Sequence, residues 1–148
     1  MTLKNLIKDK AVKADIVADC TQLVETQVAT KKGLSGLALK ATYGVVKGIG
    51  AKYIPGAIGR LLPEAFAALD PMWNEGLQHG DPVAYLIQNQ TRTADTLLKV
   101  TDARIQHSDG LIRASYNKLR NSVKSDVESA VPELATIIGT HAQAMQNV

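Results

Sequence analysis

Apolar residues recur at three- and four-residue steps along most of this chain. The first long pattern runs from Asp9 to Lys32, and its apolar members are Val12, Ile16, Cys20, Leu23 and Val28. This spacing places the side chains on one face of an α-helix, because a helix turns once in about 3.6 residues. The stretch Lys31-Lys32-Gly33 is typical of a helix end, since cations complement the helix dipole and glycine adopts the left-handed cap.

Glycine and proline divide the rest of the chain into further helical patterns. The predicted helices cover about residues 36–47, 55–69, 70–79, 82–107, 112–127 and 132–145. Pro63 should kink the 55–69 helix or split it after Leu62, because proline lacks a backbone N–H. Asp70-Pro71 and Asp81-Pro82 are predicted helix starts, with the aspartate as N-cap. Alternation typical of strands is missing from the sequence, so we expect none.

The sequence therefore predicts an all-α protein. We expect a single compact bundle of about six or seven helices over residues 1–148, with kinks near Gly50–Pro55 and Pro63. Nineteen of the 148 residues are Ala, eleven are Gly and only six are aromatic, so helices must approach closely to fill the core. Gly44 and Gly48 would share one helix ridge, and contact with another helix would offset their cost of about 1 kcal/mol each relative to Ala.

The glycines also resemble a cofactor loop. Gly44, Gly48 and Gly50 match the spacing of the phosphate-binding turn of short-chain dehydrogenases, where a buried strand precedes the glycines. The preceding residues LSGLALKATY form a helical pattern instead, and no alternation of strands and helices follows. We expect no cofactor.

No coherent catalytic or metal-ligating set is found in the sequence. A single cysteine excludes Cys-rich metal modules, and His79, His107 and His141 lie far apart, with no His-x-x-x-His or Glu-x-x-His pair in the sequence. We expect no catalytic and no metal-binding residues, and the balance favours a protein that is not an enzyme. An enzyme with an unrecognised site remains an alternative.

Positive charge gathers in the N-terminal part of the chain. Residues 1–60 hold ten Lys/Arg and four Asp/Glu. Lys40, Lys47, Lys52 and Arg60 lie in the Gly-rich region 40–60 and are candidate anion-binding residues for a phosphate-bearing metabolite or a membrane headgroup. Aromatic residues are not interleaved with the first lysines, so nucleic-acid binding is not favoured. No signal peptide or spanning segment is recognised, and we expect a cytoplasmic protein.

The segment LLPEAFAALDPMW contains the only Phe and the only Trp of the chain. Phe66 and Trp73 are predicted either to anchor the core or, if exposed, to contact a partner, because Trp is enriched at interface hot spots.

Two stretches carry a family resemblance. KKGLSGLALK, followed by Tyr43, and the LLP…ALDPMW element that ends at Trp73 resemble a group of small, uncharacterised bacterial proteins. The resemblance covers about residues 10–75. It implies a helical fold and carries no established activity.

These observations favour a non-enzymatic cytoplasmic interaction or structural protein. A homo-dimer, formed through the predicted 82–107 helix, is one arrangement. The alternative is a binder of an anionic ligand through region 40–60.

Overall fold

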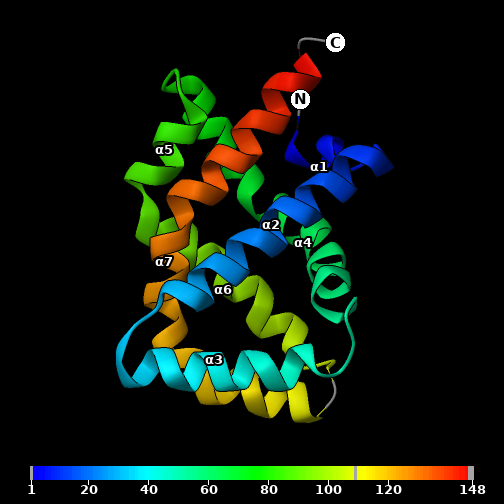
Figure 1. Ribbon diagram of the computed structural model, residues 1–148. Coiled ribbons are helices and arrows are strands. Elements are labelled where there is room, and N and C mark those ends of the chain that lie inside the picture. The colour runs from blue at the N-terminus through cyan, green and yellow to red at the C-terminus, as the bar shows by residue number, and fades with distance from the viewer. Residues whose placement is uncertain (1, 109, 147–148) are drawn as a thin grey trace.

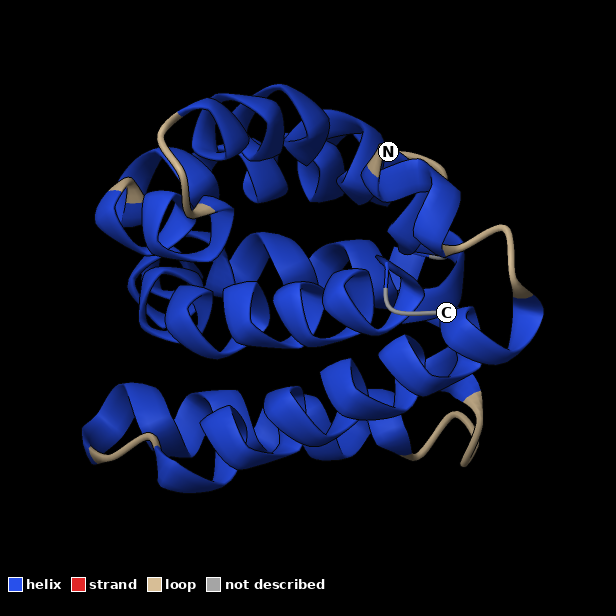
Figure 2. Cartoon of the chain, turned by 90° about the horizontal axis from the view of Figure 1, so that it is seen from above, coloured by secondary structure: helices blue, strands red, loops and turns tan. Residues whose placement is uncertain are grey.

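The computed structural model describes residues 2–108 and 110–146, and the described residues form helices joined by short loops, without strands (Figures 1 and 2). The all-α prediction is confirmed. The helices are α1 (Leu3–Leu6), α2 (Lys10–Thr30), α3 (Gly33–Lys47), α4 (Tyr53–Gln78), α5 (Pro82–Gln88), α6 (Gln90–Ile105) and α7 (Gly110–Gln146).

Helix α4 supplies the largest share of the hydrophobic core. Its buried row is Leu62, Phe66, Leu69, Met72 and Trp73. Buried side chains of α1, α2, α5 and α7 join this row in one cluster. Phe66 and Trp73 are only 1% and 5% exposed, so both are core anchors, and neither is available as a partner contact on the surface.

Helix α4 continues through Pro63 and Pro71, so the predicted split after Leu62 and the predicted helix start at Asp70 are wrong. A proline inside a helix removes one backbone hydrogen bond. Here the buried row extends on both sides of each proline, and its burial keeps the helix continuous. Asp70 does not cap its own helix. Its carboxylate instead accepts a hydrogen bond of 2.6 Å from the backbone N–H of Leu3, at the start of α1.

The predicted 82–107 helix is broken at Asn89 into α5 and α6. A break leaves backbone carbonyls without their helical donors. The buried hydroxyl of Thr93 lies 3.1 Å from the carbonyl oxygen of Leu86 and 2.9 Å from that of Asn89. The Asn89 carbonyl already accepts the backbone N–H of Thr93 at 2.9 Å, so the single hydroxyl hydrogen of Thr93 can serve the Leu86 carbonyl across the break.

Helix α7 runs from residue 110 to residue 146, and Pro132 lies inside it rather than at the start of a separate helix. Proline has no N–H to donate to the carbonyl of Glu128, four residues earlier. The side-chain amide of Gln90, on α6, donates to that carbonyl instead. A neighbouring helix thus replaces the hydrogen bond that Pro132 removes.

Helix α3 lies along one end of the bundle, beside the first turns of α7 (Figure 1). It begins at Gly33, whose φ of 80° requires the left-handed conformation that glycine adopts readily. A turn over residues 48–52 separates α3 from α4, where a kink was expected. Among the α3 residues whose burial is described, only Gly36 is buried, and it has no side chain. Helix α3 therefore contributes little to the core.

The prediction that Gly44 and Gly48 form helix contacts is wrong. Both are exposed. A Cβ atom added to Gly44 would have no other atom within 4 Å, and one added to Gly48 would meet only carbonyls of its own helix. The close contacts occur at other glycines. A Cβ on Gly76 would lie 2.6 Å from the Cα of Pro82, and one on Gly139 would lie 2.4 Å from a methyl group of Val83.

These glycines predict opposite effects of one substitution. Gly44→Ala should raise the free energy of unfolding by about 1 kcal/mol, because alanine favours the helix and the site is open. Gly76→Ala should lower it by about 1–3 kcal/mol, because the methyl group would overlap the backbone of α5. Urea denaturation of both variants measures the two changes, and a loss of stability in Gly44→Ala would contradict the exposed position of this residue.

Candidate functional site

Large apolar side chains are exposed at one end of the molecule. Five are exposed among the described residues, and four of them lie on α3, in the turn after it, and at the start of α7: Leu37 at 65%, Val45 at 52%, Ile49 at 48% and Leu111 at 50%. We call these four residues, together with Ala41, the α3–α7 face. The fifth, Leu77, lies at the C-terminal end of α4.

The face follows from the geometry of α3. Residues advance by about 100° per position around a helix, so Leu37, Ala41 and Val45 lie within about 80° of one another. The opposite side carries Leu39, Tyr43 and Val46, which are half-buried against the bundle. Both sides of α3 are therefore apolar, and only one of them is covered.

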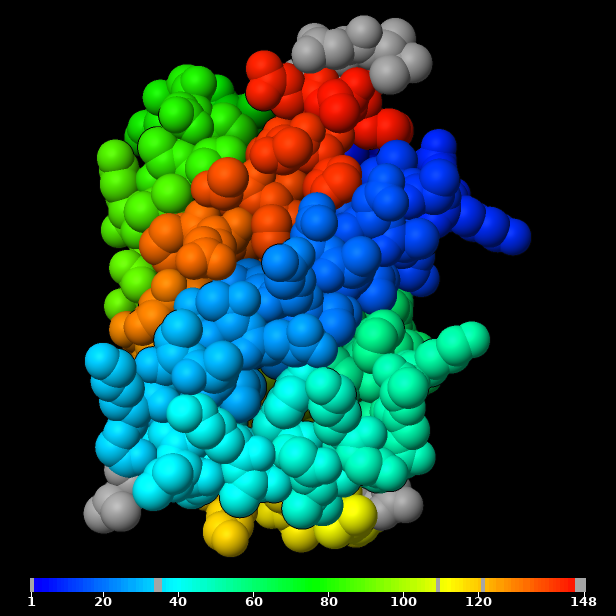
Figure 3. All heavy atoms as spheres, viewed as in Figure 1, coloured from blue at the N-terminus to red at the C-terminus, as the bar shows by residue number. Residues whose placement is uncertain are grey.

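A shallow groove connects α3 to α7 within this face. Ala41, Thr42 and Val45 line one wall, and the other wall is formed by Leu111, Ala114, Ser115 and Lys118, around a volume of about 310 Å³. In the space-filling view α3 lies in front at the lower end of the molecule, with yellow atoms from the start of α7 showing beneath it, and no other segment covers α3 from this side (Figure 3).

The face has a strongly basic surrounding. Between Glu25 and Glu64 the sequence has no Asp or Glu and six Lys/Arg. Lys40 and Lys47 follow one flank of the apolar row on α3, since both lie about 60–80° from Leu37 around the helix. Lys118 lies on the other side of the groove. The nearest carboxylate to Lys47 is that of Glu25, at 3.9 Å, and both side chains are at least half exposed.

The four predicted anion-binding residues are spread over α3 and the start of α4. Lys40 lines an apolar hollow at the α2–α3 turn. Lys52 precedes the first residue of α4 and is exposed. Arg60 lines a smaller pocket of about 160 Å³ between α4, α6 and α7, together with Arg104. The Arg104 guanidinium is already paired with Glu64 at 2.7 Å, which offsets part of the positive charge there.

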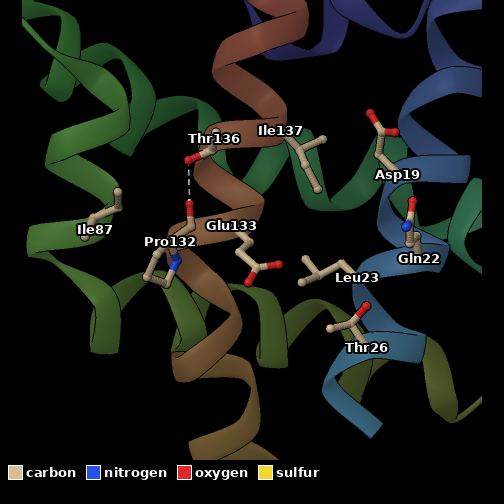
Figure 4. Close-up of a pocket in the computed structure, with 9 residues that line it drawn as sticks. All are labelled: Asp19, Gln22, Leu23, Thr26, Ile87, Pro132, Glu133, Thr136 and Ile137. Atoms are coloured by element: carbon tan, nitrogen blue, oxygen red, sulfur yellow. Dashed lines mark hydrogen bonds between the residues drawn. The ribbon is translucent and has the colours of Figure 1, made fainter. Parts of the chain in front are cut away.

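A second groove, of about 480 Å³, lies on another side of the bundle between α2, α5 and α7 (Figure 4). Leu23, Ile87 and Ile137 supply its apolar lining, and Asp19 and Glu133 supply two carboxylates. Its polar groups are partly engaged already. Asp19 lies 2.8 Å from the Nε2 atom of His141, and the Thr136 hydroxyl donates to the carbonyl of Pro132 at 2.9 Å. No local pattern of residues indicates this groove, because its walls come from segments far apart in the chain.

Two carboxylates, those of Glu75 and Asp102, each accept hydrogen bonds from an arginine and a tyrosine of other helices. The Arg92 guanidinium donates two hydrogen bonds to Glu75, of 2.8 and 3.2 Å, and the Tyr85 hydroxyl donates a third of 2.6 Å. The bonds from Arg92 and then from Tyr85 hold the pKa of Glu75 at about 2. The ring of His79 stacks on Tyr85 with centroids 5.1 Å apart. This cluster joins α4, α5 and α6.

Asp102 forms the second such cluster, between α6 and α7. Arg120 donates two hydrogen bonds to it, of 2.8 and 2.9 Å, and Tyr116 donates another. The bidentate contact with Arg120 lowers the pKa of Asp102. A general base needs a free oxygen and a pKa near the working pH. Glu75 and Asp102 have neither, so both act as structural links between helices.

The Cys20 thiol and the potential metal ligands are likewise not arranged as a reactive site. Burial, with a smaller contribution from Asp19, raises the pKa of the Cys20 thiol to about 11, which leaves it in the unreactive protonated form. In the described part of the chain, no three His, Cys, Asp or Glu side chains are placed to hold one metal ion. No helix formed by the described residues is long and apolar enough to cross a bilayer.

Comparison with known proteins gives a family and no activity. Residues 3–142 match the model of a family of unknown function (DUF6918). The chain belongs to this family. The match includes α5, α6 and nearly all of α7, so the resemblance expected over residues 10–75 extends far into the C-terminal half. No curated protein and no solved structure matches the chain.

The Glu75 cluster predicts a pH dependence of stability. Its folded-state pKa of about 2 lies below the unfolded value of about 4.3, so the stabilisation is complete above the unfolded value and is lost as the pH falls toward about 2. Glu75→Gln should therefore lose less stability than the wild type between about pH 5 and pH 2. Arg92→Gln should flatten the same window, because it removes the main cause of the low pKa. Urea denaturation across this range measures the slopes, and parallel curves for all three proteins would contradict the assignment.

Proposed function

We propose that this protein is a non-enzymatic interaction protein whose contact surface is the α3–α7 face. The observation that carries the proposal is the gathering of Leu37, Val45, Ile49 and Leu111 at one end of the molecule, with side chains about half exposed or more. Scattered apolar residues are ordinary on a surface, whereas a contiguous group with a polar rim is typical of an interaction site. The cytoplasmic location expected from the sequence is part of this proposal.

The glycines of α3 support the same surface. Gly44 costs about 1 kcal/mol in helix stability relative to Ala, and no contact within the described residues offsets that cost, while Gly48 follows the last residue of α3 as its C-cap. Both lie within about 20° of Leu37 around the helix. A surface without side chains at these two positions allows an external partner to approach the backbone of α3 closely.

The polar groups of the bundle support a role without catalysis. The carboxylates with lowered pKa values, Glu75 and Asp102, are saturated by arginine. The one thiol, Cys20, is buried. A small anionic ligand at Arg60 is less favoured than a surface contact, because the neighbouring Arg104 is already neutralised by Glu64.

Cysteine labelling inside cells tests whether the face is covered. The variants Val45→Cys and Leu77→Cys, expressed at the native level, each place one reporter thiol at a comparably exposed position, since Val45 is 52% and Leu77 46% exposed. Cys20 should stay silent because it is buried with a raised pKa. In the purified protein both reporters should react with a maleimide at similar rates.

In intact cells the reporter at Val45 should be protected at least several-fold relative to the reporter at Leu77. Equal labelling of the two positions in cells would mean that nothing covers the α3–α7 face, and the proposed function would then be wrong. Because the assay reads coverage alone, it gives the same answer for a lipid, a protein or a second copy of the chain.

A further inference from the structure

We propose that the α3–α7 face docks on the surface of an anionic lipid bilayer. The inference rests on the proposed function and names the partner of the same surface. It joins two independent features of that surface, the exposed apolar row and the positive charge around it. A peripheral membrane helix needs both, because burial of apolar side chains and attraction to anionic headgroups each contribute part of the binding free energy.

The charge around the face is complementary to an anionic surface over a long stretch of chain. Residues 26–63 carry six cations and no acid, and residues 110–125, at the start of α7, carry four cations and no acid. Three of these cations are paired, Lys31 with Asp126 of α7 and Arg120 and Lys124 with carboxylates of α6. Lys40, Lys47 and Lys118 remain around the apolar row, with Glu25 at 3.9 Å from Lys47 as a weak, exposed contact.

This charge disfavours a second copy of the chain as the occupant. A two-fold contact between identical faces would bring the lysines of one copy toward those of the other. Neither residues 26–63 nor residues 110–125 supply a carboxylate to compensate. Exposed lysines bordering an apolar surface serve a membrane contact better, because their stems cover apolar groups while the ammonium groups reach the headgroups.

The shape of the face suits insertion at the headgroup level. Helix α3 has 15 residues and is therefore about 22 Å long. Leu37, Val45 and Leu111 project from the two walls of the groove and its continuation along α3. The bare backbone at Gly44 and Gly48 lets the helix lie deeper in the interface. Since no described helix is long and apolar enough to span a bilayer, the contact is peripheral.

Vesicle flotation tests the inference with the full chain. Vesicles of phosphatidylglycerol mixed with phosphatidylcholine should carry the wild-type protein upward at low salt, and vesicles of pure phosphatidylcholine should not. The variant with both Lys40→Gln and Lys47→Gln should lower the partition coefficient by about five-fold for each lysine removed. Salt of about 1 M, which shortens the screening length to about 3 Å, should also release the protein.

Two matched controls separate the face from the general surface. Leu77→Ser removes the exposed apolar residue outside the face, and Lys99→Gln removes an exposed lysine of α6. Both should float like the wild type, whereas Val45→Ser should lower the partition coefficient by several-fold. An environment-sensitive dye on Val45→Cys should shift to the blue with anionic vesicles, and the same dye on Leu77→Cys should not. Urea denaturation checks that each variant is folded.

Four outcomes would overturn the inference. These are no flotation with anionic vesicles at low salt, equal flotation with both kinds of vesicle, flotation that is unchanged in the double lysine variant, or flotation lost equally in the control variants. A dimer in light scattering that Val45→Ser dissociates, together with no flotation, would identify a second copy as the occupant. That result would support the proposed interaction function and would show that the proposed lipid partner is wrong.

Discussion

Phe66, Leu69, Met72 and Trp73 form a buried row along α4, and α1, α2, α5 and α7 each bury side chains against it. Burial of one such side chain stabilises the fold by about 1.5–3 kcal/mol. The four side chains together contribute about 6–12 kcal/mol, which offsets a cost of about 3 kcal/mol for each of the two prolines inside α4, so the helix continues through them. Helix α1 depends on α4 for packing and also for its cap, since the Asp70 carboxylate accepts the backbone N–H of Leu3 at the start of α1.

Polar contacts fix the remaining helices around this row. Gln90 satisfies the carbonyl that Pro132 leaves free on α7, and the Thr93 hydroxyl donates across the α5–α6 break to the carbonyl of Leu86. Glu75 and Asp102 hold α6 to its neighbours through arginine and tyrosine. In each case a defect in one helix, or a carboxylate between two helices, is compensated by a side chain from another. The bundle is therefore specified by contacts between helices as much as by the helical patterns themselves.

Helix α3 stands outside this arrangement. It buries no large described side chain in the α4 cluster, and its apolar row faces outward. The buried cluster around α4 thus forms without a large side chain from α3, and packing within the described chain does not cover the apolar row of α3. The proposed contact outside the molecule would account for the exposed apolar row, for Gly44 and for the positive charge around α3.

Much of the helical content could be predicted from the sequence, because apolar periodicity and start signals are local. The limits of α4, α6 and α7 could not, since whether Pro63, Pro71 and Pro132 end a helix depends on burial and on donors from other helices. The break at Asn89 lacks the glycine or proline that would signal it.

The candidate site could be predicted only in part. The lysines of α3 were recognised from charge, and α3 itself from periodicity. Which face of α3 points outward depends on tertiary packing and cannot be read from periodicity. The sequence pattern therefore predicts helix contacts at Gly44 and Gly48, whereas the close contacts between helices occur at Gly76 and Gly139. The part of the face that α7 contributes, Leu111, was missed, because about sixty residues separate it from α3.

Native-state hydrogen exchange measures the difference between α3 and α4 directly. The backbone amides of α4 around Phe66 and Leu69 should exchange only through global unfolding, with a free energy of opening equal to that from urea denaturation. The amides of α3 around Val45 should exchange through a local opening of clearly lower free energy in the purified protein. If the amides of α3 are as protected as those of α4, the apolar row is buried in the free protein, and the account of α3 as an uncovered docking helix is wrong.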